Sequence, residues 1–503
     1  MARRLDLWLP GYGLGAPARR QARRARRDRL THVFFLVCDH YEPRHKTTRD
    51  DQAAERVAAW QREYPLFQQR CRERFGHAPL HTWFYPPHHG SEHLPRLAEM
   101  AHAGGGEVEL HYHHRDDTAA TLTRDLRTTL ADYRRHGLLL ESGDNPRTAF
   151  GFVHGDWTLD NARDGVDCGV NGELSILAGL GCWGDFTMPS ANEAQTRKIN
   201  SIYYAVDDPA RHKSHDRGVD ARVGRTDEPG FFLMQGPLSV NWRAPGYPRI
   251  ENASLTSANW GRPDRIRAWL DCQVHVKGRP EWLFVKLHTH GAVEWDFDAL
   301  FGDKALQMHA TLNEVCNDGR RYQLHYVTAR QAYNLAKAAE RGLDGDPRQY
   351  LDLVIGRPAT DFYALATPHD LRSCTASRLH IDAIAEGAPA VLNARDPRVA
   401  ALADLCDGAV LFYAQDEADD VLRAHRAAGG REAFVRDGHI VLAQGSEEMP
   451  LLGIDKVKPA TAAQPDALLA AALAGWALDV PTDLICAGLR TFDAAGKKKG
   501  KAS

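Results

Sequence analysis

Histidines and carboxylates follow several of the apolar runs in this 503-residue chain. Each run has the length of one strand buried on both faces. In a parallel barrel the loops after the strands build the active site, so these polar groups are expected to meet in one cavity. They are Asp39, His40, Glu42, His88, His89, His111, His113, His114, Arg115, His154, Asp156, Trp157, Asp185, His288 and His290.

His111 and His113 are two residues apart on a predicted strand, so they point to the same face. Two neutral imidazoles on one face suit a divalent metal ion. A single histidine of this kind is more often structural, but a set at strand ends favours metal binding. The sequence therefore predicts a metal site with His40, His111, His113 and His114 as candidate ligands. Zinc is the expected ion, with cobalt or nickel as alternatives.

The remaining polar groups are assigned to catalysis and substrate binding. A hydrolytic metal site needs a nearby carboxylate to accept a proton, and Asp39 is the candidate, with Glu42 as its competitor. His288 is the candidate proton donor, and His290 supports it or binds substrate. The expected substrate contacts are Glu42, Arg115, His154, Asp156, Trp157, Asp185 and His290. Core packing is the alternative role for Trp157.

The elements that must position these groups alternate along the chain. Strands are predicted near 32–38, 80–85, 107–111, 149–154, 182–189, 231–234 and 282–288, with polar helical stretches between most of them. Strands that alternate with helices predict an α/β fold with a parallel sheet. About seven such units by residue 320 favour a closed barrel over an open sheet.

Four regions are expected along the chain. Residues 1–30 form a basic N-terminal segment, 31–345 the barrel, 360–460 a small, mostly β accessory domain, and 461–503 an Ala-rich helix with a basic tail. Within the barrel, the charged stretch 190–230 is expected to be a long loop beside the active site or a disordered insertion.

Bulk composition limits the partners and the location. The net charge is -3 and no nucleic-acid-binding signature is present, so nucleic acid is not an expected partner. The nine cysteines show no pairing pattern, which indicates a reducing compartment, here the cytoplasm. The Arg-rich N-terminus is either a solvated segment or a peripheral contact with the inner face of a membrane.

Three of these motifs, in order, resemble those of the polysaccharide deacetylase superfamily (NodB homology, similar to carbohydrate esterase family 4). They are Asp39-His40 after the first strand, His111 and His113 on the third, and Leu287-His288 on the last. The resemblance covers roughly residues 30–335. Segments 152–161 and 185–190 are similar to an uncharacterised, divergent branch.

The resemblance implies an incomplete barrel of seven strand–helix units and a metal-dependent deacetylase. It implies Asp39 as the base, His288 as the acid, and His40 in place of the family's metal-binding Asp. His111, with either His113 or His114, would complete the site. The sequence departs from the family pattern in its Asp39-His40 pair and in having Arg115 four residues after His111.

The predicted function is hydrolysis of an acyl group, such as acetyl, from a carbohydrate or glycan precursor. A glycoside hydrolase on a similar barrel is one alternative, because Asp39, Glu42, Asp156 and Asp185 offer several carboxylate pairs. A non-catalytic glycan-binding protein that keeps the barrel is the other.

Overall fold

The computed structural model describes residues 4–141, 147–190, 192–226 and 228–358, and 389–491 apart from 401–402, 404–405, 407, 463–464 and 479. The chain divides into two compact units, Met1–Ala359 and Thr360–Ser503. The predicted start of the accessory domain, 360–388, and the basic tail, 492–503, lie outside the described residues.

A ten-stranded, mostly parallel sheet forms the centre of the first unit. Its strands run in the order β13-β1-β2-β3-β6-β7-β10-β8-β9, and β14 also pairs with β1. Every pair from β13 to β10 is parallel, and β8 and β9 are antiparallel to their neighbours. The bounds are β1 Thr31–His40, β2 His81–Tyr85, β3 Gly106–Tyr112, β6 Phe150–His154, β7 Cys182–Asp185, β8 Ile202–Ala205, β9 Val219–Asp220, β10 Phe231–Met234, β13 Trp282–Thr289 and β14 Tyr322–Tyr326. The seven predicted strands are confirmed, because each apolar run is buried on both faces as a parallel strand must be.

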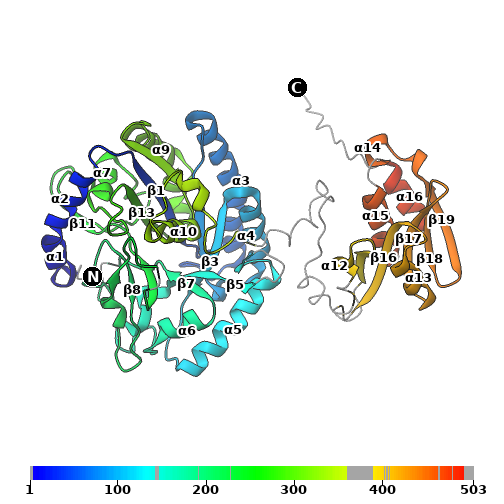
Figure 1. Ribbon diagram of the computed structural model, residues 1–503, viewed down its shortest axis with the longest axis horizontal. Helices are drawn as coiled ribbons and strands as arrows, with labels where there is room; N and C mark the ends of the chain where they lie inside the picture. The colour runs from blue at the N-terminus through cyan, green and yellow to red at the C-terminus, as the bar shows by residue number, and fades with distance from the viewer. Residues whose placement is uncertain are drawn as a thin grey trace. The chain divides into compact units, whose positions relative to one another are not determined.

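Helices surround these strands. Figure 1 shows α3, α5 and α9 around the outside of β1, β3 and β13. Inward-facing residues such as Phe34, Phe84 and Phe284 share one buried core with the Ala-rich face of α10. The helix bounds are α3 Asp50–Phe75, α4 Leu94–Met100, α5 Ala119–Arg135, α6 Glu173–Gly179, α7 Pro263–Asp271, α8 Phe297–Leu300, α9 Asp303–Cys316 and α10 Ala329–Glu340. Short strands β4 Leu140–Glu141, β5 Arg147–Thr148, β11 Ser239–Asn241 and β12 Arg249–Glu251 form two separate hairpins.

Two predictions about polar segments need correction. The stretch 190–230 is neither a simple loop nor a disordered insertion, because it contributes β8 and β9 to the central sheet. Its buried run Ile202–Ala205 is only four residues long and is hidden among charged residues. The Arg-rich N-terminus is not simply solvated: it forms α1 Leu5–Leu14 and α2 Ala16–Ala25. Trp8 is fully buried, and Arg26 donates hydrogen bonds to Gln273 (3.1 Å) and Tyr322 (3.2 Å).

The second unit is built on its own five-stranded sheet. The strands are β15 Pro389–Asn393, β16 Ala409–Asp416, β17 Arg431–Arg436, β18 His439–Gln444 and β19 Glu447–Gly453. The first three are parallel and the last two antiparallel. Helices α12 Pro397–Ala400, α13 Asp420–Ala427, α14 Pro459–Ala462, α15 Pro465–Ala477 and α16 Thr482–Thr491 complete it. The Ala-rich segment is not separate from the sheet, because Leu469 and Leu473 of α15 share a core with Leu411 and Leu442.

Candidate metal centre

Three side chains converge where β1 and β3 end. Glu42 follows β1, His111 is the penultimate residue of β3, and His113 follows that strand. The Nε2 atoms of His111 and His113 each lie 3.0 Å from Glu42 Oε1, and 3.0 Å from each other. His111 is fully buried and Glu42 nearly so, whereas the side chain of His113 is 28% exposed. The strand alternation that places both histidines on one face thus brings them to the same carboxylate.

The opposite nitrogen of each ring fixes its tautomer. His111 Nδ1 lies 2.9 Å from the carbonyl oxygen of Val153, and His113 Nδ1 lies 3.2 Å from Asp156 Oδ2. Both partners can only accept, so both Nδ1 atoms carry hydrogen. In the neutral rings both Nε2 atoms therefore present lone pairs, and these face each other and the Glu42 carboxylate. Histidines that bind metal ions are held in this way, by an N–H donated to a carbonyl or a carboxylate.

The triad fits a divalent ion in spacing and in donor type. Ligand atoms about 2.0–2.1 Å from one zinc ion in a tetrahedral site are roughly 3.3–3.4 Å from one another. The three donor atoms of the triad are 3.0 Å apart, so they need to separate only slightly to hold an ion. Two histidines and one glutamate, with one side left open, form a donor set typical of catalytic zinc. The partial exposure of His113 supplies the open side.

A proton is the alternative occupant of the triad. Burial would raise the pKa of Glu42, but the neighbouring His111, His113 and His45 hold it well below its usual range. Burial would lower the pKa of His113, but its bonds with Asp156 and Glu42 raise it to about 9. Without an ion, His113 is therefore protonated at neutral pH. Binding of a metal ion would displace that proton.

A ring of aromatic side chains borders the triad. The His40 ring centroid is 4.8 Å from that of His111, 5.1 Å from that of His290 and 6.0 Å from that of His288. Trp157 lies 5.6 Å from His40. Among the described residues, His40 Nε2 and His288 Nδ1 are buried and have no hydrogen-bond partner. Burial, and for His40 also the neighbouring histidines, holds the pKa of both rings well below the usual value, so both are neutral.

The loop after β6 supplies Asp156 and Trp157 in an unusual backbone conformation. Both residues are left-handed, with φ of 52° and 59°. Such a conformation costs energy in residues other than glycine and is concentrated at functional sites. Gly155 precedes them, and a Cβ placed there would lie 2.3 Å from Cγ of His113. Only glycine allows the loop to pass this close to the triad.

Asp39, the expected base, does not face the triad. Its Oδ2 accepts a hydrogen bond from His81 (2.9 Å) and its Oδ1 from the Gly291 amide (2.6 Å). Residues alternate along β1, so Asp39 points away from the face that carries Cys38 and His40. Both oxygens are occupied by structural partners. Asp39 therefore supports the β13 loop from behind the sheet.

Four other predicted site residues also lie elsewhere. His114 does not join His111 and His113. It faces away from them, toward His154, Cys168 and Glu173, so His154 is part of that second cluster. Arg115 is 74% exposed, and its nearest acidic partner is Asp167. Asp185 is buried and accepts hydrogen bonds from Thr187, and burial raises its pKa to about 6.

The sequence points to His114 and His154 but not to their grouping with Cys168 and Glu173, and it indicates Glu42 as a base or a substrate contact rather than as a candidate ligand. Glu42 follows His40 by two residues, and this alternation is the signal that places it on the same face. Cys168 and Glu173 have no such signal. They lie in an irregular loop and at the start of a short helix, at no spacing typical of zinc ligands.

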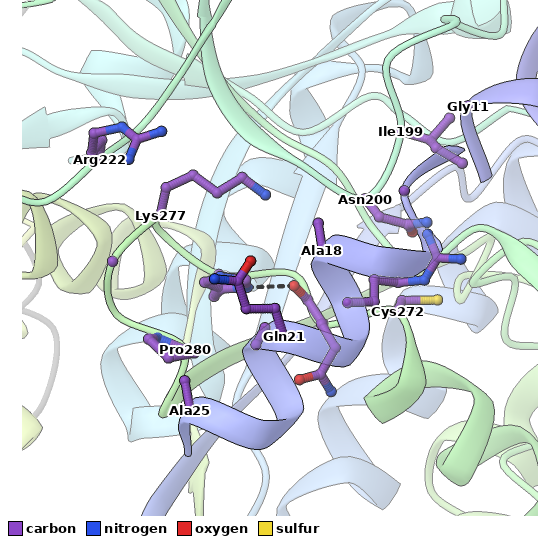
Figure 2. Close-up of a pocket in the computed structure, with 16 residues that line it drawn as sticks. Gly11, Ala18, Gln21, Ala25, Ile199, Asn200, Arg222, Cys272, Lys277 and Pro280 are labelled. Carbon is purple, nitrogen blue, oxygen red and sulfur yellow. Dashed lines mark hydrogen bonds between the residues drawn. The ribbon is translucent and has the colours of Figure 1, made fainter. Parts of the chain in front are cut away.

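Two surface cavities are lined by other residues. One, of about 570 Å³, lies between α2 and the segment around Cys272 to Pro280, with Gln21, Arg222 and Lys277 among its lining residues (Figure 2). The other, of about 710 Å³, includes Arg4 and Lys213. Neither includes a residue of the triad.

Comparison with known proteins leaves the family of the chain open. No protein-family model matches it. A cyanophycin synthetase from Nostoc sp. (strain PCC 7120 / SAG 25.82 / UTEX 2576) is 31% identical over 136 residues. The match covers 25% of this chain and 14% of that protein, so the chain spans about one seventh of this relative's length.

Proposed function

We propose that the protein is a metal-dependent hydrolase that removes an acyl group, such as acetyl, from a carbohydrate or glycan precursor. One observation carries the proposal. The Nε2 atoms of His111 and His113 and Oε1 of Glu42 all lie 3.0 Å from one another. Each imidazole is held in place by a hydrogen bond that its Nδ1–H donates. Glu42, His111 and His113 would hold the ion, with zinc the expected metal and cobalt or nickel the alternatives.

The ion would polarise an acyl oxygen and make water acidic enough to act near neutral pH. The residues around it supply the proton transfers. His40 is neutral, adjacent to His111 and has a free buried Nε2, so it is suited to accept a proton. His288 also has an unpartnered buried nitrogen, Nδ1, and lies on the last parallel strand, where the deacetylase resemblance expects the proton donor. Because its ring is neutral, it would first take up a proton and then pass it to the leaving group. These two histidines replace the carboxylate base expected from the sequence.

The carboxylates disfavour the glycoside hydrolase alternative. That mechanism needs two carboxyl groups free to flank a glycosidic bond. Asp39 is held by His81 and the Gly291 amide, Asp185 by Thr187, and Glu42 by three histidines. Asp156 alone of the four is about half exposed. One accessible carboxylate does not make a pair.

Trp157 supports a carbohydrate substrate. Its ring lies within 6.2 Å of His40, His288 and His290, measured between centroids, and is partly exposed. An indole face packs well against the apolar C–H groups of a sugar, and the neighbouring Asp156 can accept hydrogen bonds from hydroxyl groups. The substrate would therefore enter over the 155–157 loop.

A barrel form of the central sheet belongs to the same proposal. Lys286 on β13 donates hydrogen bonds to the carbonyl oxygens of Phe186 and Met188, which follow β7. Four strands separate β13 from β7 in the sheet order. A side chain bridges these ends most directly if the sheet curls into the incomplete barrel of seven strand–helix units found in deacetylases.

A cytoplasmic location and a lipid-linked precursor at the inner membrane face remain part of the proposal. No described helix has the length and apolar character needed to cross a bilayer. Arg20, Arg24 and Arg27 stay exposed on the N-terminal segment. Replacing these three with Gln should weaken sedimentation with anionic vesicles, and unchanged sedimentation would exclude this contact.

Metal content and acetate release test the proposal together. The wild-type protein should carry metal and release acetate from acetylated chito-oligosaccharides. His111→Ala/His113→Ala should lose acetate release and about one ion per chain. His212→Ala, at an exposed histidine outside the cluster, is the matched control and should keep both. A metal-loaded wild type that releases no acetate would contradict acetyl hydrolysis, and no metal after incubation with Zn²⁺, Co²⁺ or Ni²⁺ would exclude the centre itself.

A further inference from the structure

A second group of potential ligands lies beside the centre and takes no part in the proposed chemistry. His114 follows β3, His154 ends β6, Cys168 lies in the following loop, and Glu173 begins α6. One donor atom from each of the four lies within 4.8 Å of all the others. The side chains of His154 and Glu173 are 0% exposed and that of His114 is 3% exposed, and Cys168 is fully buried.

The two histidines are again oriented from behind. His114 Nδ1 lies 3.0 Å from Asp117 Oδ2, and His154 Nδ1 lies 2.5 Å from the carbonyl oxygen of Gly155. Both partners are acceptors, so both Nδ1 atoms carry hydrogen and both Nε2 atoms point inward with lone pairs when the rings are neutral. The two Nε2 atoms are 2.9 Å apart.

The acidic ligands complete the group. Glu173 Oε1 lies 3.2 Å from His114 Nε2 and 3.5 Å from His154 Nε2, and its Oε2 accepts from the Asp160 amide at 2.6 Å. Cys168 Sγ lies 4.0 Å from Glu173 Oε2. Two imidazoles, one cysteine thiolate and one carboxylate are all ligand types found in zinc sites. Four protein ligands with no exposed side are typical of a structural ion rather than a catalytic one.

A buried ion pair is the competing explanation. A proton on His114 Nε2 could be shared with Glu173 and His154 and would satisfy those three side chains. That explanation leaves the Cys168 thiol with two long contacts, 3.9 Å to the Val170 carbonyl oxygen and 4.0 Å to Glu173 Oε2. A metal ion accounts for all four side chains at once.

We propose that His114, His154, Cys168 and Glu173 form a second metal site, which holds a structural zinc ion. This inference does not rest on the proposed function. The ion would join the ends of β3 and β6 to the irregular 155–172 loop and to α6. That loop contains left-handed non-glycine residues such as Asp160, Asn161 and Asp164, so it has little regular structure of its own to hold it. The ion would cross-link this loop to β3, β6 and α6.

Metal stoichiometry with matched cysteine variants tests the second site. The wild-type protein should hold about two ions per chain, and Cys168→Ser should hold about one. Cys182→Ser is the matched control, because Cys182 is also buried and its thiol likewise contacts the carbonyl oxygen two residues further on. His111→Ala/His113→Ala should also hold about one ion, so failure of the open centre can be distinguished from failure of this site. Equal metal content in wild type and Cys168→Ser would overturn the proposal.

Cobalt substitution identifies the thiol directly. Wild type, Cys182→Ser and His111→Ala/His113→Ala should show a sulfur-to-cobalt charge-transfer band, and Cys168→Ser should not. If Cys168→Ser fails to fold, the wild-type protein alone decides: chelation should increase alkylation of Cys168 and leave Cys182 unchanged. A cobalt band that persists in Cys168→Ser, or equal alkylation of Cys168 with and without chelator, would exclude the site.

Discussion

The open triad and the closed four-residue cluster use nearly the same parts. Each has two histidines anchored through Nδ1–H and one glutamate oxygen between their Nε2 atoms. They differ in the fourth position and in access. The closed cluster adds Cys168 and is almost fully buried, whereas the triad has no fourth protein ligand among the described residues and leaves His113 partly exposed.

This difference separates two roles for similar ligand sets. A position left open beside an ion can be taken by water or substrate, so the triad is suited to chemistry. A fourth protein ligand occupies that position. Because such an ion binds only the folded chain, its binding free energy stabilises the fold. The unpartnered ring nitrogens of His40 and His288 lie beside the triad, next to His111 and Trp157. Four substitutions can break or sharpen this comparison.

The largest effect is expected at His40. His40→Ala should lower kcat for acyl release by about 10²–10⁴-fold, because it removes a neutral proton acceptor without removing a ligand of the triad. Both ions should be retained. Steady-state kinetics with metal analysis checks this, and His212→Ala serves as the unaffected control. Unchanged kcat would mean that His40 has only a packing role.

A matched pair of second-layer variants should give an intermediate effect. Asp156→Asn removes the carboxylate behind His113, and Asp117→Asn removes the one behind His114. Each should weaken metal affinity by about 10–100-fold at its own site and by much less at the other. The loss should be greater for Asp117, which is 16% exposed, than for Asp156, which is 48% exposed.

Competition with a chelator measures both affinities, with acyl release reporting the open centre and the cobalt–thiolate band the closed site. If either variant weakened both sites equally, the two clusters would not be separate sites.

The smallest effect concerns pH and the support of the closed cluster. Asp185 accepts from Thr187, whose hydroxyl accepts the His154 amide hydrogen at 2.9 Å. Burial raises the pKa of Asp185 from 3.8 to about 6, so the folded state holds a proton that the unfolded state releases between these values. The free energy of unfolding of wild type relative to Asp185→Asn should therefore fall as pH rises from 4 to 6, and then level off. Urea midpoints across this range check the prediction, and a parallel pH dependence in both proteins would contradict it.

Much of the first unit could be predicted because each parallel strand is a continuous apolar run. Thr31–His40 and Trp282–Thr289 stand out for this reason. The strands β8 and β9 could not be predicted, because they lie within a stretch of mostly charged and polar residues and their pairing depends on distant partners. The N-terminal helices were misjudged for a related reason. Charge composition suggested solvation, but the buried Trp8 and the bonds of Arg26 hold them against the unit.

The candidate site could be predicted only where alternation along a strand applies. His111 and His113 share a face by that rule, and so do His40 and Glu42. Asp39 fails by the same rule, since neighbours on a strand point to opposite faces. The resemblance to deacetylases assigned it a role that its orientation does not support. Cys168 and Glu173 join the second cluster through the path of an irregular loop, which no local pattern encodes.

His113 and His114 are consecutive residues that serve different clusters. The peptide that joins them and the backbone of Gly155 border both sites. The Gly155 carbonyl oxygen contacts His154 Nδ1, and the Gly155 Cα is so close to the His113 ring that no Cβ would fit. Metal binding at one site would order this shared backbone. It would therefore change the conformational entropy that the chain loses when the other site binds its ion. Thermodynamic linkage requires this influence to be mutual. The structural ion in the closed cluster would therefore change the affinity of the open triad for its catalytic ion.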